Sequence, residues 1–147
     1  MAEQVIDASV AIKWVVKGEP FRNAARQLLY DARLNDILLL GPPLLEYEIE
    51  SILQRFLYHR NATIPAVNAA LAAFYAVKVQ IVTHSDLIRR ARRIARQFDQ
   101  ERIYDSIYAA LAERRGCEFW TADRVFYDAV KRDLLFVKYL PTYLEMP

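Results

Sequence analysis

Hydrophobic residues follow two alternating patterns along the chain. Short, unbroken apolar runs, such as Val5-Ile6 and Ile37-Leu38-Leu39-Leu40, are typical of strands buried inside a parallel sheet. The longer stretches between them carry apolar residues at helical spacing, which predicts amphipathic helices. The pattern predicts helices at residues 10–15, 21–34, 43–60, 64–75, 83–98, 103–115 and 123–132. It predicts a first strand that ends at residue 6 and further strands at residues 37–40, 77–82, 118–121 and 136–137.

Regular alternation of strands and helices predicts parallel strand pairing. We therefore expect a three-layer α/β/α sandwich around a central, mostly parallel sheet of four to five strands. The 147 residues are the length of one ordinary domain, and no repeat, linker or low-complexity segment interrupts them. A single domain over residues 1–147 is the expectation.

Composition narrows the class of protein further. Hydrophobic residues make up 54% and charged residues 26% of the chain, as in globular proteins. The net charge of +2 neither requires nor excludes nucleic acid. A single cysteine, Cys117, excludes an internal disulfide and a multi-cysteine zinc site. Charged residues interrupt every apolar stretch well short of the ~20 residues of a membrane span. We expect a cytoplasmic protein without a membrane segment.

Two acidic residues follow directly on predicted strands. Asp7 comes after Val5-Ile6, Asp123 comes after the run 119–122, and a helical pattern begins after each acid. The carboxyl ends of parallel strands face the same crevice, which is where open α/β sheets bind ligands. For each aspartate alone, a helix N-cap is a sufficient explanation. A functional role therefore depends on further carboxylates aimed at the same place.

Glu48 and Asp105 are the further candidates. Glu48 shares a helix face with Leu45 and Ile52, so its carboxylate is directed inward, which is costly without compensation. A buried salt bridge to an arginine is the alternative explanation. Asp105 lies in the first turn of its predicted helix, where the helix dipole alone also favours an acid.

Together, the four acids suggest a metal site. Carboxylates crowded at one sheet edge repel one another, and hard divalent cations such as Mg²⁺ or Mn²⁺ relieve the repulsion with oxygen ligands. Sites of this kind hydrolyse phosphodiester bonds with a metal-bound water. No other nucleophile competes for the role, because His59 and His84 lie in no recognisable triad or metal-binding spacing.

Four segments, in this order and spread over essentially the whole chain, resemble the PIN-domain nucleases and in particular the VapC-type toxins of bacterial and archaeal toxin–antitoxin pairs. They are Val5-Ile6-Asp7-Ala8-Ser9, Pro42 with Tyr47-Glu48-Ile49, Tyr104-Asp105-Ser106-Ile107-Tyr108-Ala109-Ala110-Leu111-Ala112, and Thr121-Ala122-Asp123. Each motif is weak alone, and the set of four is specific.

The resemblance implies a metal-dependent endoribonuclease that hydrolyses RNA to a 5′-phosphate and a 3′-hydroxyl. It implies an α/β/α fold in which Asp7, Glu48, Asp105 and Asp123 are catalytic and hold Mg²⁺ or Mn²⁺. It also implies a partner, a small VapB-like antitoxin that blocks the acidic pocket. We expect a homodimer, because residues 56–58 and the alanine-rich run 66–75 are apolar enough to dimerise or to take the antitoxin segment.

Supporting residues are carried over in the same way. Ser9 and Thr121 match positions whose hydroxyls commonly support the acids. Ser51 stands where family members often carry asparagine, so one supporting contact is expected to be missing. Lys13 and Arg124, close in sequence to Asp7 and Asp123, are the candidates for contact with the scissile phosphate.

The predicted helix 83–98 is strongly basic, with Arg89, Arg93 and Arg96 on one face. A solvated surface and phosphate contact explain it equally well. Three tyrosines, Tyr104, Tyr108 and Tyr127, are placed either to stack on bases or to pack in the core.

Other classes fit less well. A haloacid-dehalogenase-like enzyme needs a second aspartate where Ser9 stands, and a receiver domain needs a phosphoacceptor aspartate where the chain has Val82-Thr83-His84. A dinucleotide-binding fold needs a glycine-rich turn, which is absent. The remaining alternatives to a toxin are a PIN-type RNA-processing nuclease and a catalytically silent scaffold that binds RNA or protein.

Overall fold

A five-stranded parallel sheet forms the centre of the structure, a computed structural model that describes residues 1–145. The strands are β1 (Glu3–Ile6), β2 (Leu38–Gly41), β3 (Gln80–Ile81), β4 (Glu118–Thr121) and β5 (Val137–Tyr139), and they lie in the order β3-β2-β1-β4-β5. All neighbouring pairs are parallel. The expected sandwich with a parallel central sheet is confirmed.

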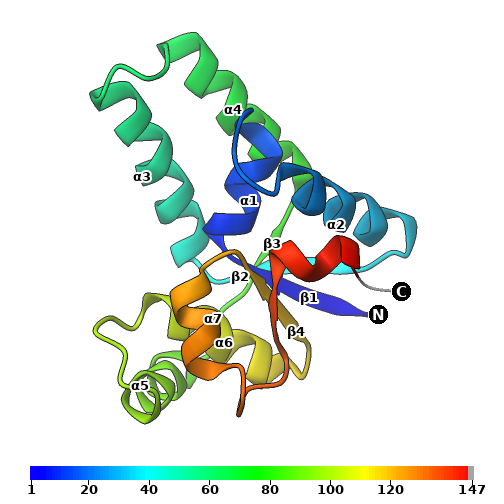
Figure 1. The fold of residues 1–147 in the computed structure, drawn as a ribbon, viewed down its shortest axis with the longest axis vertical. Helices are drawn as coiled ribbons and strands as arrows, with labels where there is room; N and C mark the ends of the chain where they lie inside the picture. Colours follow the sequence, from blue (N-terminus) through cyan, green and yellow to red (C-terminus); the bar gives the residue numbers. More distant parts are fainter. Residues whose placement is uncertain (146–147) are drawn as a thin grey trace.

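Helices cover both faces of this sheet. They are α1 (Ala8–Val15), α2 (Arg22–Leu34), α3 (Leu44–Tyr58), α4 (Ile64–Val77), α5 (Leu87–Gln97), α6 (Tyr104–Arg115) and α7 (Arg124–Val130), followed by a 3₁₀ helix at Leu140–Glu145. Figure 1 places α1, α2 and α4 on one side of the sheet and α5, α6 and α7 on the other. Right-handed crossovers in opposite directions from the middle of the sheet produce this division.

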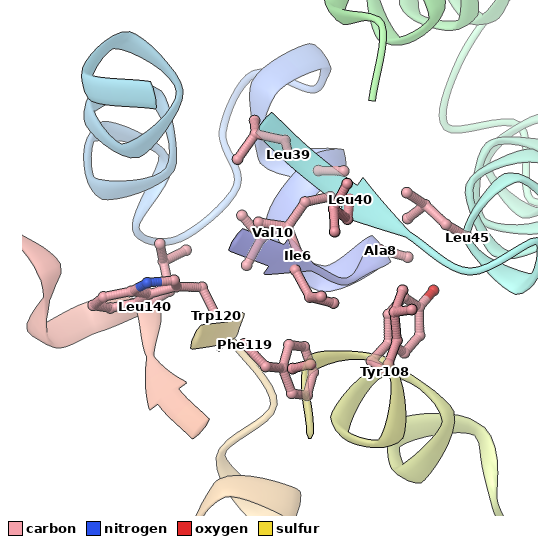
Figure 2. Packing of buried hydrophobic residues seen from close by; sticks show 14 of the residues in the cluster. Ile6, Ala8, Val10, Leu39, Leu40, Leu45, Tyr108, Phe119, Trp120 and Leu140 are labelled. Atoms are coloured by element: carbon pink, nitrogen blue, oxygen red, sulfur yellow. The ribbon is translucent and has the colours of Figure 1, made fainter. Parts of the chain in front are cut away.

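The core lies where β1 and β4 are sandwiched between α1 and α6. Ile6, Phe119 and Tyr108 are almost completely buried there, and the rings of Tyr108 and Phe119 stack with centroids 5.8 Å apart. Figure 2 shows this packing, with Phe119 and Tyr108 near Ile6, and with Leu45 beside α3. The apolar runs of the sequence become strands because both of their faces are covered.

The third strand differs from the prediction. A strand was expected over residues 77–82, but β3 contains only Gln80 and Ile81, and both are exposed. Val77 instead ends α4, because Lys78 takes a left-handed conformation with φ of 62° that stops the helix. The apolar residues of this segment therefore predicted a longer strand than the one that forms at the edge of the sheet.

The 3₁₀ helix at Leu140–Glu145 was not predicted. Tyr143 in this helix donates a hydrogen bond to Asp31 of α2 at 2.6 Å. Its ring also lies edge-on to Trp120, with centroids 5.0 Å apart. These contacts pack the 3₁₀ helix against α2 and β4.

Candidate active site

The acidic residues lie where the order of the strands reverses. β1 pairs with β2 on one side and with β4 on the other, so the connections leave β1 and β4 in opposite directions. Asp7 follows the last residue of β1, and Asp123 follows β4 by two residues. Open parallel sheets bind ligands at the carboxyl ends of strands at such a switch point.

Asp7 is the most firmly held of the four acids. It is 3% exposed and caps α1, accepting a hydrogen bond from the backbone N–H of Val10 at 3.1 Å. The hydroxyls of Ser9 and Thr121 each donate to its carboxylate at 2.5 Å. Asp7 is therefore a helix N-cap, which was one explanation that the sequence allowed. It also accepts hydrogen bonds from side chains that follow β1 and end β4.

The same two hydroxyls join the ends of β1 and β4. Ser9 Oγ accepts a hydrogen bond from the backbone N–H of Ala122 at 2.9 Å, and Thr121 Oγ1 accepts one from the N–H of Asp123 at 3.0 Å. Asp123 itself caps α7 by accepting from the N–H of Phe126 at 3.0 Å. Backbone and side-chain hydrogen bonds thus fix Asp7 and Asp123 relative to each other.

Glu48 is half-buried on α3 and has no arginine partner among the described residues. Instead, the hydroxyl of Tyr108, in α6, donates to Glu48 Oε1 at 2.5 Å. Burial and the charge of Glu48 raise the pKa of Tyr108, so this hydroxyl keeps its proton and acts as a donor. In Figure 2 the Tyr108 hydroxyl points away from the Phe119 ring, toward the side on which Leu45 lies.

Asp105 lies in the first turn of α6 and is partly buried. Burial, and after it the charges of Asp123, Asp7 and Glu48, raise the pKa of its carboxyl to about 7. The carboxyl of Asp105 is therefore close enough to all three other acids to be repelled by them. The structure brings the four acids predicted from the sequence to one edge of the sheet.

The other acids respond to the same surroundings. Burial raises the pKa of Asp7 to about 6, although its bonds from Ser9, Thr121 and Val10 oppose the change. Burial also raises the pKa of Glu48, against the hydrogen bond from Tyr108. Negative charge at this edge is consequently unfavourable until a cation or a proton offsets it.

The donor set suits a hard divalent cation. All four side chains offer carboxylate oxygens, the ligands that Mg²⁺ and Mn²⁺ prefer. Within residues 1–145, no group of three or more His, Cys, Asp or Glu is already arranged as a closed metal-binding cluster. Ligation by three or more of the acids would therefore require some of their carboxyl groups to reorient toward a common point.

The two basic residues proposed for phosphate contact are placed less favourably. Lys13 is 7% exposed on α1, so its aliphatic stem is packed in the core. Arg124 is exposed at the start of α7, and its Nε lies 3.5 Å from Asp128. Neither makes an ion pair with one of the four acids in the described part of the chain.

The structure also separates the remaining candidates. Tyr108 is 1% exposed and cannot stack on a base, whereas Tyr104 is 49% exposed. Tyr127 stacks on Tyr139 with centroids 5.1 Å apart. Ser51 is exposed on α3. The link between Tyr108 and Glu48 was not foreseen, and no local sequence signal indicated it.

We expect Asp105→Asn to stabilise the protein when divalent cations are absent. The raised pKa of Asp105 means that the folded state holds its proton more tightly than the unfolded state, whose pKa is near 3.8. The metal-free parent therefore loses stability as the pH rises from about 4 to about 7. The variant should gain about 1 kcal/mol at neutral pH, or about 3 °C in Tm.

Thermal unfolding in a chelator, from about pH 5 to about pH 8, measures this effect. The matched control is Asp133→Asn, the same exchange at an exposed acid without an ion pair in residues 1–145. The Tm of Asp105→Asn could instead fall at neutral pH or follow the pH dependence of the parent. Either result would contradict the conclusion that burial and the neighbouring acids raise the pKa of Asp105.

Comparison with known proteins agrees with this architecture. The family model described as PIN domain matches residues 5–132, so the chain belongs to the PIN-domain family. Domains of this family are generally metal-dependent nucleases that bind nucleic acid.

A solved structure, that of PAE2754 from Pyrobaculum aerophilum, is similar with a TM-score of 0.67 at 20% sequence identity. The likeness covers 98% of this chain and 95% of that one, and at this identity it shows a shared fold alone. No curated protein matches the chain. None of the helices within residues 1–145 combines the length and apolarity needed to span a membrane.

Proposed function

We propose that this PIN-domain protein is a Mg²⁺- or Mn²⁺-dependent endoribonuclease with Asp7, Glu48, Asp105 and Asp123 as its catalytic residues. The observation that carries the proposal is the convergence of these carboxyls, from four separate elements, at the switch point of the sheet. Crowded carboxylates cost free energy in the isolated protein, so their placement favours a cation-binding role over a structural one.

Each residue has a distinct part in the proposed chemistry. Asp7 offers a rigid ligand, because Ser9 and Thr121 hold its carboxylate on both oxygens. Tyr108 holds one oxygen of Glu48 and leaves the other free for a ligand. A bound divalent ion would supply a water molecule of lowered pKa and would offset the charge of the scissile phosphate. Asp105 and Asp123 would complete the set of oxygen donors, and Asp105, whose pKa burial raises to about 7, is suited to act as a proton acceptor near neutral pH.

Cleavage of a labelled single-stranded RNA with and without chelator tests this proposal. We expect cleavage with Mg²⁺ or Mn²⁺, its loss in excess chelator, and its recovery when the metal is restored in excess. The products should carry a 5′-phosphate and a 3′-hydroxyl. Cleavage that persists in chelator, or no cleavage with either metal, would contradict the proposed activity.

We further propose that the enzyme is the toxin of a VapBC-type toxin–antitoxin pair in the cytoplasm. The motif set and the domain size support this role. Large apolar side chains on the α3–α4 hairpin are well exposed, with Tyr58 at 78%, Ile64 at 64% and Tyr75 at 46%. This surface suits a VapB-like antitoxin segment or a second copy of the chain in a homodimer.

Expression of the protein in a bacterial host tests the toxin role. We expect growth to stop on induction, and we expect Asp7→Asn to restore it, because the arrest would depend on cleavage. Co-expression of a small antitoxin encoded immediately upstream should also restore growth. Harmless expression of an active nuclease would favour RNA processing instead.

A further inference from the structure

α5 and α6 form a hairpin that ion pairs hold together at one end. Asp86, the residue directly before α5, lies 2.7 Å from Arg90 and 3.7 Å from Arg114 near the end of α6. Arg90 also pairs with Glu113 at 3.0 Å. These contacts join the start of α5 to the end of α6, so the two helices are antiparallel. The end of α5 therefore lies beside the start of α6, which carries Asp105.

Two arginines between the middle and the end of α5 form no ion pair among the described residues. Arg92 and Arg96 are exposed and make no ion pair with any residue of the described chain, whereas Arg93 pairs with Glu113. Arg92 and Arg96 line a pocket of about 460 Å³ together with Ala95, Asp99, Gln100 and Ile103. Asp99 contributes one negative charge to this pocket, and it forms no ion pair with either arginine. The lining is therefore net positive.

This pocket adjoins the acidic site through the start of α6. Ile103 lines the pocket and is the last residue before α6, and Tyr104 and Asp105 follow it directly. Tyr104, which is half exposed, lies between the pocket and the acid in the sequence. In Figure 1 the loop from α5 to α6 projects on the side of the molecule where α3, α6 and α7 begin. Two arginines without an ion pair in the described chain thus line a pocket that reaches to within two residues of Asp105 along the chain.

We infer that Arg92 and Arg96 bind the phosphate backbone of the RNA strand beside the cleavage site, where α6 begins. This inference rests on the proposed ribonuclease function. An RNA strand that approaches four carboxylates is repelled by them, so cations at the rim are needed to hold the flanking phosphates. Arg92 and Arg96 are one helical turn apart, and their mutual repulsion is relieved when a phosphate lies between them. The contact involves the backbone alone and is independent of base sequence.

The test compares Arg92→Gln/Arg96→Gln with a matched control, Arg26→Gln/Arg33→Gln. The control removes the same charge from two exposed arginines on α2, on the opposite face of the sheet, where Arg26 lines a pocket of about 360 Å³. Binding of a fluorescent RNA of about 12 nucleotides is measured by anisotropy at several salt concentrations. Both pairs are placed in an Asp7→Asn chain with Mg²⁺ present, so that the RNA stays intact.

We expect the α5 double variant to bind about tenfold more weakly and to lower the slope of log Kd against log salt by about 1. The α2 pair should leave both values close to those of the parent. In the otherwise unchanged enzyme, the α5 pair should raise KM about tenfold for the long RNA at unchanged kcat. For an RNA of about three nucleotides, too short to reach the pocket, KM should stay the same.

Equal affinities and salt slopes for the α5 variant and the parent would overturn the inference, as would an equal loss in the α2 control. Stronger Arg92- and Arg96-dependent binding of an oligoglutamate peptide than of RNA would also overturn it, in favour of an acidic protein partner. Arginine-dependent RNA binding without any cleavage would leave the inference standing and reject the proposed activity. RNA cleavage by the α5 double variant with the KM of the parent would support the proposed activity and reject the inference.

Discussion

Asp7→Asn should lower RNA cleavage about 10³-fold while the protein stays folded. A catalytic metal ion contributes several kcal/mol to transition-state stabilisation, and each 1.36 kcal/mol is a factor of ten in rate. The asparagine side chain would keep an oxygen to accept the Val10 N–H, so the cap of α1 is retained. The Thr121 hydroxyl can rotate to accept from the new amide. Only the charge that we propose to hold the metal is lost.

Single-turnover cleavage rates and far-UV circular dichroism measure the two parts of this prediction. Thermal stability in chelator should equal or exceed that of the parent, because the buried charge is gone. Asp133→Asn is the matched control and should cleave normally. Parent-like cleavage by the Asp7→Asn protein would remove Asp7 from the site and with it the proposed arrangement of ligands.

Gly41→Ala should lower kcat/KM by about 10²-fold and destabilise the protein by about 1–3 kcal/mol. Gly41 ends β2, and a Cβ at this position would lie 2.5 Å from Leu45 Cδ2 and 3.2 Å from Leu45 Cβ. Leu45 is completely buried, so its side chain cannot turn outward into solvent, and its Cβ is also closer than ordinary van der Waals contact. We therefore expect the first turn of α3 to shift, and Glu48 lies one turn farther along the same helix.

Urea unfolding and steady-state kinetics with Mg²⁺ measure these effects. The control is the double variant Gly41→Ala/Leu45→Val, in which the shorter side chain makes room for the new methyl group. We expect its stability and kcat/KM to exceed what the two single variants would give if their effects were additive. A Gly41→Ala protein with parent stability and activity would show that the contact between β2 and α3 does not position Glu48.

Local sequence patterns were sufficient for most of the fold. β4 has the predicted bounds, and α2 and α6 each begin one residue after the predicted start. The helix N-caps at Asp7 and Asp123 were predictable because a cap depends on hydrogen bonds to residues only three positions away. β3 was predicted too long, since alternating apolar residues at an edge satisfy the strand pattern without being covered on either face.

The site was less accessible to local reasoning. The inward direction of Glu48 followed from helical spacing, but its partner, Tyr108, is 60 residues away in the chain. Lys13 was expected near the phosphate from its closeness to Asp7 in sequence, yet its position on α1 packs its stem in the core. The basic helix looked uniform in sequence, and only ion pairs to α6 distinguished Arg90 and Arg93 from Arg92 and Arg96.

The sequence alone determined the succession of strands and helices and the acids at the strand ends, because both depend on spacings of a few residues. The tertiary structure decided the order β3-β2-β1-β4-β5, the hydroxyl bridge from Ser9 and Thr121 to Asp7, and the pairing of Tyr108 with Glu48. These features depend on which distant elements pack together, and the free energy of that packing is shared among residues far apart in the chain.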